Sequence, residues 1–113
     1  MRVMHVMAGA EEGGAENIML ESVLALAEAG HAQHVVTRPD NAFRLGKFAA
    51  AGIGTDTASF NTSWPFPTRK VIDAAIAAFK PDVIEYWMGR AGQFAPAAHR
   101  ARSIGWYGGY YKL

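Results

Sequence analysis

Short apolar runs alternate with helical repeats along the whole chain. Residues 2–7, 34–37, 53–58, 82–86 and 103–107 have the length and apolar content of buried strands. Between these runs, apolar side chains recur at helical spacing over residues 15–29, 42–51, 68–79 and 92–102. Gly30 and Gly52 follow two of these repeats, in the position where a left-handed helix end favours glycine. The pattern therefore predicts five strands separated by four helices.

The alternation of strands and helices also predicts how the strands are arranged. Strands joined through helices form βαβ units, whose strands are parallel and whose crossovers are right-handed. We therefore expect an α/β fold: a three-layer, Rossmann-like, doubly wound sheet of about five strands in the order 3-2-1-4-5. Ligands of such sheets bind beyond the carboxyl ends of the strands, where the winding reverses beside the first strand. Residues 8–14, 87–90 and 107–109 are expected to surround that crevice.

Composition narrows the function classes. The 113 residues fit one domain, and half of them are hydrophobic, which indicates a folded chain. A net charge of +1 argues against a nucleic-acid partner. The absence of Cys excludes zinc thiolate sites, and no apolar run reaches the roughly 18 residues of a membrane span. These observations favour a cytoplasmic protein.

The last quarter of the chain is basic. No acid follows Glu85, whereas Arg90, Arg100, Arg102 and Lys112 do. This stretch is either an ordinary solvated face or a surface for an anionic ligand, a partner or membrane headgroups.

A glycine-bearing segment follows the first strand and opens the first helix. Amides at such a helix start attract anions, so Gly13 and Gly14 are candidate ligand-binding residues. The dinucleotide fingerprint would require a third glycine at position 11, where this chain has Glu11. A carboxylate there repels a pyrophosphate, which disfavours NAD or FAD. The glycines could also simply permit a tight turn.

A second candidate segment follows the fourth strand. Trp87 offers a stacking surface and Arg90 a phosphate donor, although Trp87 could equally be a packing residue. No metal site is predicted: His5 is expected in the core, and His31 and His34 have no third ligand nearby.

Several segments together resemble a known enzyme family. Residues 4–16 read Met-His-Val-Met-Ala-Gly-Ala-Glu-Glu-Gly-Gly-Ala-Glu, residues 24–31 end in Ala-Gly-His, and residues 80–84 read Lys-Pro-Asp-Val-Ile. In order and spacing they resemble the N-terminal domain of GT-B glycosyltransferases, of the retaining, nucleotide-sugar-dependent kind (glycosyltransferase group 1, family 4-like). Residues 87–91 and 108–111 are similar to a subgroup of cell-envelope and polysaccharide enzymes.

The resemblance implies roles for particular residues. Residues 1–113 would form the acceptor-side domain, and a C-terminal domain absent from this sequence would hold the nucleotide-sugar. The glycines Gly13 and Gly14 would contact the donor diphosphate or the acceptor. The acceptor cleft would be lined by Trp87, Arg90, Tyr107 and Gly108. Many relatives carry a His after the fifth strand, where this chain has Tyr107 or Gly108. The catalytic residues are not identified, and no cofactor is implied beyond the nucleotide-sugar co-substrate.

The implied activity is sugar transfer to a hydroxyl of a glycan or lipid-linked acceptor, in cell-envelope polysaccharide or lipopolysaccharide biosynthesis. Residues 1–113 alone are expected to be inactive, and the enzyme is expected in the cytoplasm, with peripheral contact at the inner face of the membrane. Two alternatives remain open at this stage. One is a flavodoxin-like binding or regulatory module, and the other is the nucleotide-binding half of an NAD(P) oxidoreductase with Arg38 near the ribose.

Overall fold

The structure is a computed structural model that describes residues 1–8, 14–39, 42–87, 91, 94 and 102–106. Five strands lie in one sheet: β1 (Arg2–Met7), β2 (Ala32–Thr37), β3 (Gly54–Thr57), β4 (Val83–Trp87) and β5 (Arg102–Trp106). Their order is β3-β2-β1-β4-β5, and every neighbouring pair is parallel. The predicted doubly wound sheet and its strand order are confirmed.

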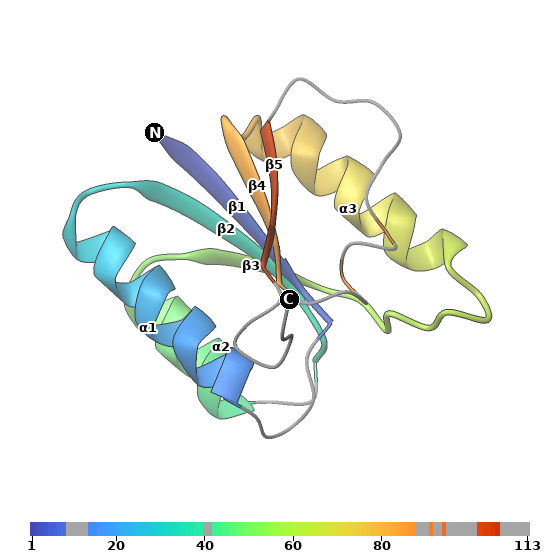
Figure 1. Ribbon diagram of the computed structural model, residues 1–113, viewed down its shortest axis with the longest axis horizontal. Helices are drawn as coiled ribbons and strands as arrows, with labels where there is room; N and C mark the ends of the chain where they lie inside the picture. The colour runs from blue at the N-terminus through green and yellow to red at the C-terminus, as the bar shows by residue number, and fades with distance from the viewer. Residues whose placement is uncertain (9–13, 40–41, 88–90, 92–93, 95–101, 107–113) are drawn as a thin grey trace, which may run out of the picture.

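The described helices cover both faces of this sheet. Figure 1 shows α1 (Gly14–Glu28) and α2 (Ala42–Ala50) on one face and α3 (Phe66–Phe79) on the other. Successive residues of a strand point to opposite faces, so the apolar run of β1 supplies both layers. The cluster beneath α1 and α2 includes Met7, Met19, Val23, Phe48 and Trp87. The cluster beneath α3 includes Met4, Val6, Phe60, Ile72 and Ile84.

The helix ends follow the glycine signals. Gly30 and Gly52 have φ of +88° and +76°, as predicted for residues that end α1 and α2. The start of α3 differs from the prediction, because this helix begins at Phe66 rather than at residue 68. Proline is well tolerated in a first helical turn, where its missing N–H would have had no partner, so Pro67 does not delay the helix.

The bounds of four strands also differ from the prediction: β2 begins at Ala32 rather than at residue 34, β4 covers Val83–Trp87 rather than residues 82–86, and β3 and β5 differ as follows. The strand predicted over residues 53–58 is shorter, because the Ile53 amide donates to the Phe48 carbonyl at 2.9 Å and so closes the end of α2. Strand β5 already begins at Arg102, the last residue of the predicted fourth helix. Of that predicted helix only Phe94 is otherwise described, and it packs in the cluster beneath α3, 5.4 Å from Phe60 between ring centroids.

The amino edge of the sheet is joined by polar contacts. The Arg2 amide donates to Oδ2 of Asp82 at 2.9 Å, and the Asp82 amide donates to the Arg2 carbonyl at 2.8 Å. The Arg2 guanidinium donates to the Phe79 carbonyl and lies 4.3 Å from the centre of the Phe79 ring. Asp82 therefore fastens the turn before β4, as expected for a residue at the edge away from the ligand site.

Candidate functional site

The winding of the sheet reverses between β1 and β4. The chain leaves β1 through α1 on one face and reaches β4 through α3 on the other, so the carboxyl ends of these strands border the expected ligand crevice. The last residues of the two strands, Met7 and Trp87, are paired in the sheet. Helix α1 begins at Gly14, which directs the amides of its first turn toward this edge. Gly13 lies outside the described residues.

Trp87 occupies the carboxyl end of β4 and is only 2% exposed. Its ring packs with Met7, Met19 and Val23 beneath α1, and its indole N–H donates to Nδ1 of His5 at 3.2 Å. This placement supports the packing interpretation of Trp87. The side chain supports the end of β4, where the residues of the second candidate segment begin.

His5 is fully buried in the centre of the sheet, as the sequence predicts. Burial outweighs the hydrogen bond to Gln33 and lowers the pKa of the imidazole to about 4, so the ring is neutral at pH 7. Since Nδ1 accepts from Trp87, the ring proton belongs on Nε2, which lies 2.8 Å from Oε1 of Gln33. The Gln33 amide then donates to the Val23 carbonyl at 2.7 Å. One directed chain of hydrogen bonds thus links β4, β1, β2 and α1.

Glu85 lies beside this chain of hydrogen bonds. It is paired with His5 in the sheet, and its carboxylate lies 3.9 Å from Nδ1 of that ring. Desolvation raises the pKa of Glu85 above its usual value. Because His5 is neutral, the contact is not an ion pair at pH 7. Glu85 is a half-buried carboxyl near the centre of the sheet, facing the α1 side.

Two polar residues at the carboxyl edge of the sheet were not among the candidates predicted from the sequence. Arg44 of α2 is 6% exposed, and its Nη1 lies 3.8 Å from Sδ of Met7. Thr37 ends β2 opposite Met7, is buried, and its hydroxyl has no hydrogen-bond partner within the described part of the chain. The sequence did contain a sign that Arg44 is buried. It lies four residues before Phe48, and residues four apart share one face of a helix, here the apolar face. Together they bring a guanidinium and a hydroxyl to the edge where the glycine segment begins.

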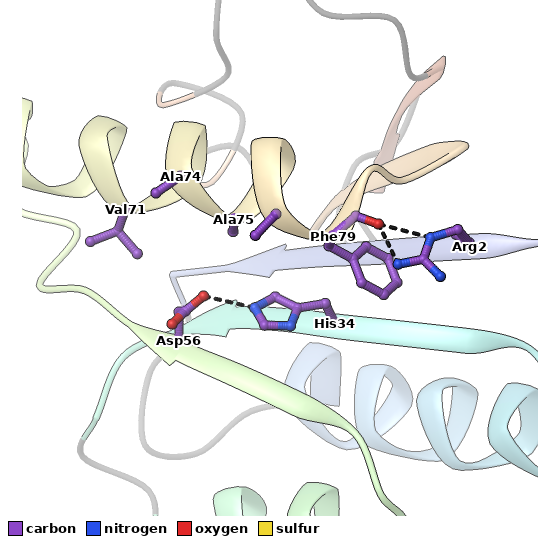
Figure 2. A pocket seen from close by; sticks show the side chains of 8 residues that line it. Arg2, His34, Asp56, Val71, Ala74, Ala75 and Phe79 are labelled. Atoms are coloured by element: carbon purple, nitrogen blue, oxygen red, sulfur yellow. Dashed lines mark hydrogen bonds and ion pairs between the residues drawn. The ribbon is translucent and has the colours of Figure 1, made fainter.

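A groove of about 510 Å³ lies between α3 and the strands β2 and β3 (Figure 2). Nε2 of His34 lies 2.8 Å from Oδ2 of Asp56, and the His34 ring is 5.6 Å from that of Phe79. Gly54 makes room for this ring, because a Cβ atom there would lie 2.8 Å from Nδ1 of His34. The groove reaches Arg2 at the amino edge and lies on the α3 side of the sheet. It is therefore separate from the edge where α1 begins.

Like Gly13, the candidate residues Arg90, Tyr107 and Gly108 lie outside the described residues. Within the part that is described, no three His, Asp or Glu side chains come together as a metal site would require. Among the same residues, no helix has the length and apolar character needed to cross a membrane.

The sequence was compared with protein families and with curated proteins. No protein-family model matches the sequence. Over 110 residues the chain is 34% identical to the lipopolysaccharide core biosynthesis glycosyltransferase LpsD of Rhizobium meliloti (strain 1021), a match that covers 97% of this chain and 32% of that protein. The chain is therefore similar to one part of this glycosyltransferase. It spans about a third of the length of this curated relative.

Solved structures agree on the fold. A glycosyltransferase from Rickettsia africae ESF-5 superposes with a TM-score of 0.77 at 17% identity, over 99% of this chain and 31% of that one. Glycinamide ribonucleotide transformylase 1 from Symbiobacterium toebii superposes with a TM-score of 0.55 at 15% identity, over 92% of this chain and 50% of that one. The second match carries a different name on the same architecture, so these superpositions show the fold alone.

Proposed function

We propose that this chain is the acceptor-side, Rossmann-like domain of a GT-B glycosyltransferase. The observation that carries the proposal is the 34% identity to LpsD over almost the whole chain. The full enzyme would transfer a sugar from a nucleotide-sugar to a hydroxyl of a glycan or lipid-linked acceptor, in envelope polysaccharide or lipopolysaccharide biosynthesis. A second domain, outside these 113 residues, would hold the nucleotide. The flavodoxin-like and oxidoreductase alternatives share the fold but lack such a sequence match.

The carboxyl edge of the sheet would supply the electrostatics of this transfer. As the sugar leaves, negative charge develops on the nucleotide diphosphate, and fixed donors that face it lower the barrier. The amides at the start of α1, at Gly13 and Gly14, are the proposed donors. Arg44 adds a cation on the same side of the sheet, beside Met7. Arg90, Tyr107 and Gly108 remain the proposed lining of the acceptor cleft, with Trp87 supporting the end of β4.

Sugar transfer by the full-length protein tests this proposal. With UDP- or GDP-sugar donors and a lipopolysaccharide core oligosaccharide, we expect Gly14→Ala to lower the rate about tenfold, because the added Cβ disturbs the amides that face the anion. The matched control is Gly46→Ala in the interior of α2, where a Cβ would meet nothing within 4 Å. This control should transfer sugar at the unaltered rate.

The second half of the test uses residues 1–113 alone. In saturation-transfer NMR we expect signals from the core oligosaccharide and no sugar transfer. A measurable transfer rate from this chain alone would refute the division between an acceptor domain and a donor domain. If the chain bound NAD(P) and not the oligosaccharide, the oxidoreductase alternative would be favoured instead.

We also propose that the enzyme works in the cytoplasm and touches the inner face of the membrane, where a lipid-linked acceptor would be met.

A further inference from the structure

Exposed large apolar side chains gather where the described helices begin. Ile18 of α1 and Phe43 of α2 are 44% and 70% exposed, and Trp64 and Phe66 at the start of α3 are 60% and 62% exposed. Helices that follow parallel strands begin toward the carboxyl edge of the sheet, so these four positions lie in or just before the parts of the helices nearest that edge. Trp64 and Phe66 also touch each other, with ring centroids 5.5 Å apart and planes at 78°. They therefore form a continuous surface and not two separate exposed residues.

The segment that presents these rings is braced. The Phe60 amide donates to Oγ1 of Thr68 at 3.0 Å, while the Phe60 ring is buried in the cluster beneath α3. The Ser63 amide donates to Oδ1 of Asn61 at 2.9 Å, and the Trp64 amide donates to the Asn61 carbonyl at 3.3 Å. These hydrogen bonds fix the backbone between Phe60, whose ring is buried, and the exposed rings of Trp64 and Phe66. The outward rings are placed by the fold.

Positive charge accompanies the two rings. Arg69 and Lys70 follow Phe66 by three and four residues, which puts them on the same side of α3, and both are exposed. Residues 57–72 contain these two bases and no Asp or Glu, and the next acid is Asp73. We call Trp64, Phe66, Arg69 and Lys70 the aromatic patch.

We propose that the aromatic patch docks the protein on an anionic phospholipid bilayer. Tryptophan and phenylalanine rings enter the headgroup region readily, and bases beside them are attracted to lipid phosphates. An uncharged patch would fit any apolar partner equally well, whereas paired rings beside two bases complement a negatively charged surface, even with the single acid Asp73 one turn beyond them. The proposal rests on the membrane contact proposed above and names the residues that make it. It does not depend on sugar transfer.

Vesicle co-sedimentation of the 113-residue chain tests the proposal. We expect binding to vesicles that contain phosphatidylglycerol and at least about tenfold weaker binding to phosphatidylcholine vesicles. The variants Trp64→Ser/Phe66→Ser and Arg69→Gln/Lys70→Gln should each weaken binding to the anionic vesicles about tenfold. The controls are Phe43→Ser, an exposed ring on the opposite face, and Lys47→Gln/Lys80→Gln, which removes the same charge elsewhere. Both controls should bind as the unaltered chain does.

A second measurement reports on the ring itself. Lipids brominated near the headgroup should quench the fluorescence of the unaltered chain, and Trp64→Phe should bind equally while losing most of that quenching. Equal binding to neutral and anionic vesicles, or unchanged binding by Trp64→Ser/Phe66→Ser, would overturn the proposal. Variants that lose binding to a soluble anionic oligosaccharide but not to vesicles would overturn it in favour of a glycan site. Because the vesicles contain no sugar donor or acceptor, either result leaves the proposed transfer activity to its own test.

Discussion

The two edges of the sheet are built differently. At the amino edge, Arg2 and Asp82 exchange backbone and side-chain hydrogen bonds, so polar groups there are used to join strands. At the carboxyl edge, the structure places a buried hydroxyl, a buried guanidinium and an exposed tryptophan, on Thr37, Arg44 and Trp64. The first arrangement joins strands, whereas the second places a cation, a hydroxyl with no partner among the described residues and an exposed ring at the edge where ligands of parallel sheets bind.

Trp87 is the strongest test of this difference between the two edges, because it lies at the carboxyl edge and yet is buried. We expect Trp87→Ala to lower the free energy of unfolding by about 3–5 kcal/mol, because it leaves a large cavity beneath α1. Trp87→Phe should cost less, about 1–3 kcal/mol, because the packing remains while Nδ1 of His5 loses its donor. Urea denaturation measures both changes.

The matched control is Trp64→Ala, which removes an equally large ring that is 60% exposed. Its effect on the free energy of unfolding should stay within about 0.5 kcal/mol. If Trp87→Ala lowered the free energy of unfolding equally little, Trp87 would line the cleft as a stacking residue, the other role that the sequence suggested.

His5 provides a prediction on pH. Its folded-state pKa of about 4 lies below the 6.5 of the unfolded chain, so the unfolded state binds more protons between these values. Stability is therefore full above pH 6.5 and is lost as the pH falls toward 4. Between pH 7 and pH 5 the loss from His5 should be about 2 kcal/mol, measured as a fall in the free energy of unfolding in urea.

Glu85, which faces His5, acts in the opposite direction. Its pKa is raised in the folded state, so the folded chain gains stability relative to the unfolded one as the pH falls through that raised value. We therefore expect His5→Leu to flatten the loss between pH 7 and pH 5, and Glu85→Gln to steepen it. If the His5→Leu variant still lost the same free energy of unfolding between pH 7 and pH 5, another titrating group would be responsible for the loss.

Much of the fold was accessible from the sequence because local signals agreed with each other. Gly30 and Gly52 marked helix ends that the structure confirms, and apolar runs between helical repeats gave the strand order. The prediction failed where a contact from outside the segment decided the boundary. The Ile53 amide is taken by the Phe48 carbonyl, which shortens β3, and this competition is not visible in the apolar pattern.

The site was harder to predict than the fold. The sequence pointed to the glycine segment and to Trp87, but it gave no means of telling a packing tryptophan from a stacking one, since that depends on what covers the ring. Thr37 and Arg44 were missed because each looks ordinary in its own element, one ending a strand and the other within a helix. They become candidates only when β1, β2 and α2 are brought together at one edge.

Asp82 gives the smallest expected effect and tests the amino edge directly. Asp82→Ala removes the acceptor for the Arg2 amide, an exposed hydrogen bond, and should lower the free energy of unfolding by about 1 kcal/mol. Asp82→Asn keeps an oxygen in the same place and should cost less than half as much. Neither variant should alter binding of a core oligosaccharide in saturation-transfer NMR. A change in that binding without a change in stability would mean that the amino edge also takes part in recognition, and the division between the two edges would fail.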